Sequence, residues 1–91
     1  MILHQFNTSL NADNAYQSAL PLIGNDDSLL FMGEALYGLL QPELCRPSVP
    51  TYVLAEDVIA LGLEQQLAHF KQIDYAQWVH LTQAHDKVIS W

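Results

Sequence analysis

Residues 51–63 read TYVLAEDVIALGL, in which a strand pattern passes directly into a helix pattern. Residues 51–54 combine β-branched, aromatic and aliphatic side chains, the types that are enriched in strands. Glu56 and Asp57 then fall in the first turn of a helix, where negative charge complements the helix dipole. Gly62 fits the left-handed position that ends many helices. We therefore expect a strand over residues 51–54 and a helix from there to the glycine.

Two other apolar runs, residues 1–6 and 28–32, are also predicted as strands. Between them, Asn11 offers an N-cap for a helix. Pro21 should kink or end this helix, because proline cannot donate the backbone hydrogen bond to Gln17. The apolar face expected from helical spacing consists of Ala12, Ala15, Tyr16, Ala19, Leu20 and Ile23.

The segment between the second and third strands is predicted as a short helix followed by a loop. Residues 41–50 contain three prolines, which favour the loop. The helix over residues 34–40 should point four apolar side chains inward: Ala35, Leu36, Leu39 and Leu40.

The C-terminal part continues the alternation of strands and helices. We expect a short strand over residues 70–73 and a final strand over residues 88–91. Asp74 is placed to cap the helix between them. We expect Trp91 to lie at an interface. Alternation of this kind is typical of one α/β domain, here residues 1–91, with a mainly parallel sheet of about five short strands. One face of the last helix should carry Tyr75, Trp78, Val79 and Thr82.

The composition predicts a protein that associates with partners. Hydrophobic residues make up 51% of the 91 residues and charged residues only 14%, against about 25% charged residues in ordinary soluble domains. A domain of this length buries only about 60–65% of the surface of its unfolded chain. Part of the apolar area should therefore stay exposed and mark an interface. Without its partners, we expect the chain to form a homo-oligomer.

The charge balance and the single cysteine exclude several classes of protein. The net charge is −7, and the isolated Arg46, Lys71 and Lys87 cannot form a phosphate-binding patch. We therefore expect no direct contact with nucleic acid and no attraction to an anionic membrane. Cys45 alone cannot form an internal disulfide, residues 1–6 lack the basic start of a signal peptide, and no apolar run is long enough to span a bilayer. The expected location is cytoplasmic.

Several stretches form an ordered set that is more informative than any one of them. Residues 1–4 read MILH, and an acidic turn precedes a leucine-rich strand over residues 24–31. Residues 52–63 read YVLAEDVIALGL, and residues 73–91 run from Ile-Asp-Tyr through Leu-Thr and His to a closing Trp91. In this order, and over nearly the whole chain, they resemble the DsrH/TusB family.

This resemblance implies a DsrE/F/H-like fold, a three-layer α/β/α sandwich around a mainly parallel sheet. It also implies a heterohexamer that holds two copies each of this chain and of TusC- and TusD-like sister subunits. Such a complex takes persulfide sulfur from a donor carrier protein and hands it to an acceptor, toward 2-thiolation of the tRNA wobble uridine. In sulfur-oxidising bacteria, the related DsrEFH-type complex serves sulfur oxidation instead.

The family pattern also implies where the relay thiol belongs. In the catalytic sister subunit, the sulfur-carrying cysteine lies just after the third strand, at the start of the next helix, where a helix N-terminus lowers a thiol pKa. The corresponding residues 54–57 read LAED here, and carboxylates cannot accept sulfane sulfur. The resemblance therefore implies a noncatalytic subunit of a sulfurtransferase complex, without an enzyme activity of its own.

Cys45 supports a competing hypothesis, in which the chain itself carries a persulfide. It lies between Pro42 and Pro47 and beside Arg46, whose charge favours a thiolate. However, Cys45 does not match the family's sulfur position, and no cysteine precedes it in the chain. We interpret it as incidental and keep the carrier role as the alternative.

The four histidines do not predict a metal site. His80 and His85 are five residues apart and so leave one helical face, while His4 and His69 fall on other elements. His4 is the most interesting of them, because we expect it at the end of the first strand, and parallel sheets place ligand sites at the carboxyl ends of their strands.

The remaining candidates have simpler interpretations. Glu56 and Asp57 are read as a solvated helix start rather than an acid/base pair. The chain has no G-x-G-x-x-G motif and no P-loop, so we expect no nucleotide cofactor, and a flavodoxin-like ligand-binding module is the less favoured third hypothesis. Core and subunit contacts explain the aromatic residues Phe31, Tyr37, Trp78 and Trp91.

Overall fold

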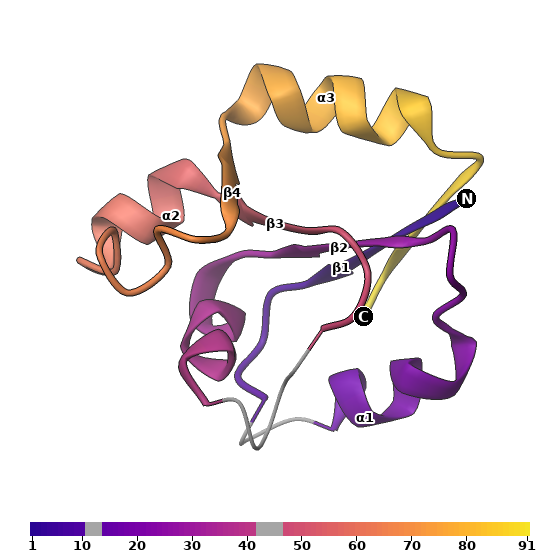
Figure 1. The fold of residues 1–91 in the computed structure, drawn as a ribbon, viewed down its shortest axis with the longest axis horizontal. Coiled ribbons are helices and arrows are strands. Elements are labelled where there is room, and N and C mark those ends of the chain that lie inside the picture. The colour runs from indigo at the N-terminus through magenta and orange to yellow at the C-terminus, as the bar shows by residue number, and fades with distance from the viewer. Residues whose placement is uncertain (11–13, 42–46) are drawn as a thin grey trace.

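A computed structural model describes residues 1–10, 14–41 and 47–91 of the chain. Within these ranges, five strands form one sheet in the order β4-β3-β2-β1-β5, and every neighbouring pair is parallel. The predicted α/β fold with a mainly parallel sheet is confirmed (Figure 1). The strands are β1 (Ile2–Phe6), β2 (Ser28–Phe31), β3 (Thr51–Leu54), β4 (Lys71–Ile73) and β5 (Lys87–Ser90).

The connections between the strands cover the two faces of the sheet unequally. From β1 to β4 the chain moves steadily toward one edge, and the intervening segments pack on one face. The helix α3 (Tyr75–Ala84) then crosses the opposite face and delivers β5 beside β1 (Figure 1). The segments on the first face are α1 (Ala15–Ala19), the 3₁₀ helices η1 (Leu20–Leu22) and η2 (Gly33–Leu40), and α2 (Ala55–Ala60).

The larger core lies on the face covered by α1, η2 and α2. Phe6 pairs in register with Phe31, and Phe31 pairs with Val53, so their side chains form a row across three strands. The rings of Phe6 and Phe31 stack with centroids 5.2 Å apart. Burial of apolar area in this cluster supplies most of the hydrophobic stabilisation. Its buried members are Phe6, Leu10, Tyr16, Ala19, Leu29, Phe31, Ala35, Leu36, Leu39, Val53, Val58, Leu63 and Leu67.

The opposite face has a much smaller core. Its buried members are Leu3, Leu30 and Ile73, and Trp78 and Leu81 of α3 pack against them only partly buried. No residue of α3 is fully buried. The face predicted for this helix was therefore wrong in part, because Trp78 packs on the sheet but its companion there is Leu81, which was not predicted.

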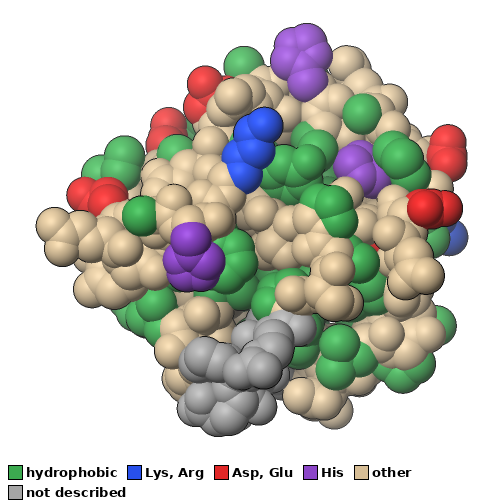
Figure 2. All heavy atoms as spheres, viewed as in Figure 1, with side chains coloured by type: hydrophobic (Ala, Val, Ile, Leu, Met, Phe, Trp, Pro, Cys, Tyr) green, Lys and Arg blue, Asp and Glu red, His purple; other side chains and the backbone are tan. Residues whose placement is uncertain are grey.

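Two apolar residues that were predicted on that face, Tyr75 and Val79, are 49% and 55% exposed. They belong to a wider set of exposed large hydrophobic residues that includes Leu22 and Ile59. Figure 2 shows hydrophobic side chains spread over the visible face, with acidic side chains mainly toward its left and right margins. The exposed apolar area expected from the composition is thus present in the folded chain.

The helices end where local signals predict. Gly62 has a φ of +69°, and the amide of Leu63 donates to the carbonyl of Val58 at 2.9 Å, which closes α2 in a Schellman motif. Asp74 accepts from the amide of Gln77 while the Gln77 side chain accepts from the amide of Asp74, a complete capping box on α3.

Two segments differ from expectation. The first helix is short and begins after Asn14, while the predicted cap Asn11 lies outside the described residues. Pro21 does end the α-helix, because the chain continues after Ala19 as the 3₁₀ turn η1. The segment predicted as a short helix over residues 34–40 is a 3₁₀ helix, and its Leu40 is exposed rather than inward.

Candidate functional site

The carboxyl ends of the parallel strands meet at one edge of the sheet, where α/β proteins place their sites. At this edge, β3 runs into the first turn of α2, which carries Glu56 and Asp57. The carboxylate of Asp57 accepts a hydrogen bond of 2.8 Å from the backbone amide of Gly33, at the start of η2. Asp57 therefore ties the end of β2 to the start of α2.

Gly33 makes this bond possible through its backbone conformation. Its φ is +57°, a region that side-chain-bearing residues rarely adopt. A Cβ at this position would also lie 3.2 Å from the carbonyl oxygen of Asn7, which follows β1. The ends of β1, β2 and β3 are thus packed closely, and the amide of Gly33 has no room for a ligand between it and Asp57.

The second acidic residue of this turn faces α3. The negative charge of Glu56 raises the pKa of the Tyr75 phenol, with smaller contributions from partial desolvation, a hydrogen bond to Glu56 and the charge of Asp57. Tyr75 is exposed, so solvent screens this interaction. The edge therefore offers carboxylates and a phenol, which can hold protons and hydrogen bonds but cannot carry sulfane sulfur.

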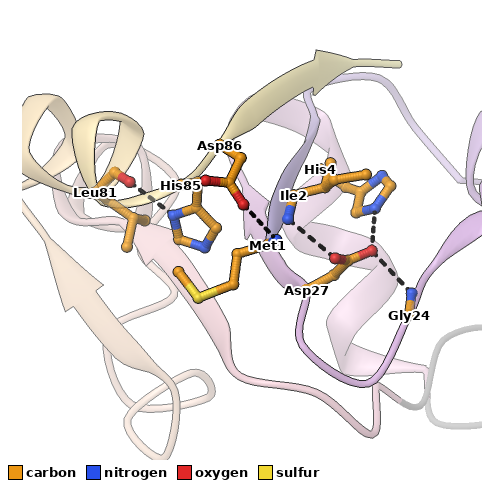
Figure 3. Close-up of polar contacts among 8 residues, drawn as sticks. All are labelled: Met1, Ile2, His4, Gly24, Asp27, Leu81, His85 and Asp86. Carbon is orange, nitrogen blue, oxygen red and sulfur yellow. Dashed lines mark hydrogen bonds and ion pairs between the residues drawn. The ribbon is translucent and has the colours of Figure 1, made fainter.

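A second polar cluster surrounds the carboxylate of Asp27, just before β2 (Figure 3). Its Oδ1 accepts from the amide of Ile2 at 2.9 Å, and its Oδ2 accepts from the amide of Gly24 at 2.8 Å. The same Oδ2 lies 3.0 Å from Nε2 of His4. Burial disfavours the charged form of Asp27, but hydrogen bonds from Gly24, His4 and Ile2 outweigh it and hold its pKa below the ordinary value.

His4 lies in the middle of β1 and its side chain is fully buried. The expectation that it lies at the carboxyl end of the strand was wrong. On its other side, Nε1 of Trp91 donates to Nδ1 of His4 at 3.1 Å, and the two rings stack at 6.2 Å with an angle of 21° between their planes. The amide of Trp91 also donates to the carbonyl of Gln5 at 2.9 Å.

Sequence reasoning singled out His4 and Trp91 separately but missed their contact and the role of Asp27. The three residues are separated by up to 87 positions, and no local pattern links them. Only the parallel pairing of β1 with both β2 and β5 brings them together.

The other candidate residues are not gathered into a site. His80 and His69 are exposed, and His85 contacts the carbonyl of Leu81 at 2.7 Å through Nδ1 (Figure 3). Among residues 1–10, 14–41 and 47–91, no three His, Cys, Asp or Glu side chains are grouped as metal ligands. Cys45, Arg46 and Pro42 lie outside the described ranges.

One groove lies between α3 and the β3–β4 edge, with a volume of about 300 Å³. Its lining is mostly apolar and includes Tyr52, Ile73 and Leu81, with His80 and Lys71 at its polar side.

No helix in the described part of the chain combines the length and the apolar character that crossing a bilayer requires.

Comparisons with known proteins give one family and one fold. A family model described as DsrH-like protein matches residues 8–88. The solution NMR structure of the protein Tm0979 from Thermotoga maritima has a TM-score of 0.69 and 16% sequence identity, covering 94% of this chain and 95% of that one. No curated protein sequence matches the chain. The likeness to Tm0979 shows a shared fold over almost the entire length of both chains.

Proposed function

The chain belongs to the DsrH-like family, and from this premise we propose that it is a noncatalytic subunit of a heterohexameric sulfur-relay complex of the TusBCD type. Its partners are TusC- and TusD-like sister subunits. The complex passes persulfide sulfur from a donor carrier protein to an acceptor, toward 2-thiolation of the tRNA wobble uridine in the cytoplasm.

One observation carries the noncatalytic role. The start of α2, where the family pattern places the relay cysteine, holds Ala55, Glu56 and Asp57. Asp57 is already committed to the amide of Gly33, and Glu56 interacts with Tyr75. A thiolate is the nucleophile that a persulfide relay requires, and these side chains supply none.

The exposed apolar side chains support the role of a subunit. Tyr75 and Val79 project from a helix that has no charged residue between Tyr75 and Ala84, on a chain of net charge −7. Exposed apolar area of this kind marks interfaces. In the proposed complex, this chain positions its partners, and the chemistry takes place on the sister subunit's cysteine.

Assembly is tested by co-expressing the chain with the two sister subunits from the same genome and measuring the mass of the purified complex by light scattering. We expect one particle that contains all three chains in equal amounts. A chain that stays a monomer beside its folded sister subunits would contradict the proposal.

Function is tested by deleting the gene and measuring 2-thiouridine in total tRNA by mass spectrometry. We expect the modification to be lost, and to return fully with the wild-type chain and with the Cys45→Ser variant. Failure of Cys45→Ser alone, with normal complex assembly, would favour the alternative in which Cys45 carries the persulfide. Unchanged 2-thiouridine with impaired sulfur oxidation would favour the DsrEFH-type role.

A further inference from the structure

Three side chains from distant segments form a continuous hydrogen-bonded row in the first face of the sheet: Asp27, His4 and Trp91. We propose that this row is an acid-sensitive clasp, in which a proton on Nδ1 of His4 releases the Trp91 indole from β1. The inference concerns the fold of this chain alone and does not rest on its proposed function.

The partners of His4 determine its protonation state in the clasped structure. The indole N–H of Trp91 can only donate a hydrogen bond, so Nδ1 of His4 must be unprotonated to accept it. The single proton of the neutral ring is then on Nε2, where it is donated to the carboxylate of Asp27. The clasped state therefore requires one tautomer of a neutral imidazole.

A second proton can be added only at Nδ1, where it would point at the Trp91 N–H. Two donors would then face each other, and the bond between the rings would be lost. The bond to Asp27 would become an ion pair, because hydrogen bonds keep the pKa of Asp27 low and its carboxylate charged in mild acid. Acid thus strengthens the contact between His4 and Asp27 and breaks the hydrogen bond between Trp91 and His4.

Release of the indole affects how β5 is held. β5 is an edge strand that, within the described ranges, pairs only with β1, and most of its side chains are exposed. Trp91 packs against the larger core cluster and stacks on His4. It is therefore a main side-chain attachment of the end of β5, and its release should loosen that end while β1 to β4 stay folded.

Other ionisable groups adjoin β1, and their response to pH must be distinguished from that of His4. Asp26 lies in the segment before β2, and Tyr16 lies in α1. Asp86 directly precedes β5, whose first residue is Lys87. Asp86 accepts from the Met1 amine at 2.9 Å, and this hydrogen bond raises the pKa of the amine. Asp, Lys and Tyr side chains ordinarily keep one charge state between about pH 5 and 8.

A second histidine, His85, follows α3 and precedes Asp86, whose amide donates to the carbonyl of Met1 at 2.9 Å. Histidine side chains in general change charge between about pH 5 and 8. His85→Gln is therefore the control that distinguishes an effect of acid at His4 from an effect of acid at His85.

The test uses ¹⁵N-labelled full-length chain and two-dimensional NMR from about pH 8 to about pH 5, the interval in which histidines change charge. At about pH 8, the long-range ¹H–¹⁵N spectrum of the His4 ring should show the tautomer with its proton on Nε2. On acidification, the protection of the Trp91 indole proton, relative to a free indole at the same pH, should fall about tenfold, the equivalent of one hydrogen bond. The Trp78 indole is the internal reference, since it has no hydrogen-bond partner in the described structure.

His4→Gln removes the titration while keeping the shape of the clasp, because its amide can donate to Asp27 and accept from Trp91. In this variant the Trp91 indole should stay protected to the lower end of the range, and in His85→Gln it should still be released. An Nδ1–H tautomer, or an indole that stays protected in the wild type until the whole chain unfolds, would overturn the proposal.

A second measurement applies if His4→Gln does not fold. Trp91→Phe keeps an aromatic ring but lacks the donor, so it removes the bond that acid is proposed to remove. The difference in unfolding free energy between wild type and Trp91→Phe should be largest near pH 8 and shrink toward pH 5. A difference that does not change with pH would contradict the clasp.

Discussion

The two faces of the sheet differ in how completely they are covered. On one face, segments from three connections bury a continuous core around Phe31. On the other, one helix lies over three buried side chains, and none of its own residues is buried. The first face is closed by the chain itself, whereas the second is left partly open. The difference indicates that stability comes from one face while the other remains free for association.

Phe31→Ala should have the largest effect, because this ring is fully buried in the centre of the larger core. Loss of a buried aromatic ring costs about 3–5 kcal/mol of unfolding free energy. Urea unfolding followed by circular dichroism measures the loss. The matched substitution on the open face, Trp78→Ala, should cost about half as much, because Trp78 is only partly buried. Equal costs would remove the contrast between the faces.

Asp27→Asn should come next, with a loss of about 1–3 kcal/mol at neutral pH, because an amide nitrogen cannot accept from the donors around it. The folded pKa of Asp27 lies below its ordinary value of 3.8. The carboxylate therefore stabilises the fold above that value, and this contribution is lost as the pH falls through the folded pKa. In acid unfolding experiments, the wild-type and variant curves should converge below about pH 4. Parallel curves would show that the carboxylate charge contributes nothing.

Asp74→Ala tests what holds α3 on the open face. The capping box supplies two hydrogen bonds to the first turn of a helix that buries little. We expect a loss of about 1 kcal/mol, with faster hydrogen exchange at the amides of α3 and unchanged exchange in β2 and β3. A uniform increase across the sheet would mean that α3 and the larger core unfold as one unit.

Val79→Ser should have the smallest effect on the isolated chain, within about 0.5 kcal/mol, because this side chain is 55% exposed. Thermal unfolding of the purified chain measures it, with Gln66→Ser at another exposed position as the control. A loss of more than about 1 kcal/mol would mean that the chain already covers this position, for example by self-association.

Features that depend on neighbouring residues were predictable from the sequence. Gly62 and Asp74 bound their helices as expected, because the hydrogen bonds that define these caps span only a few residues. Pro21 ended its helix for the same reason. The parallel direction of the strands was predicted from the alternation of strands and helices and is confirmed, whereas their order in the sheet was not predictable from it.

Features that depend on tertiary packing were not predictable in this way. Helical spacing predicted one face of α3 that carries Trp78 together with Tyr75 and Val79. In the structure Trp78 packs on the sheet beside Leu81, which was not predicted there, while Tyr75 and Val79 are exposed. Asp27 looked like one acid among several in a turn, and only strand register shows that it meets His4. The role of Cys45 stays a prediction, since that residue lies outside the described ranges.

The pairing of β5 with β1 has a consequence for biosynthesis. Leu3 lies opposite Val88 in the finished sheet, so one side of β1 finds its partner only after more than 80 intervening residues have been made. Contacts of such long sequence separation form late, because the entropic cost of closing the loop comes before the contacts can stabilise the chain. A nascent chain still on the ribosome therefore presents an apolar, unpaired strand edge for most of its synthesis. Chaperone binding and truncation damage should concentrate on β1, although it is the first strand to emerge.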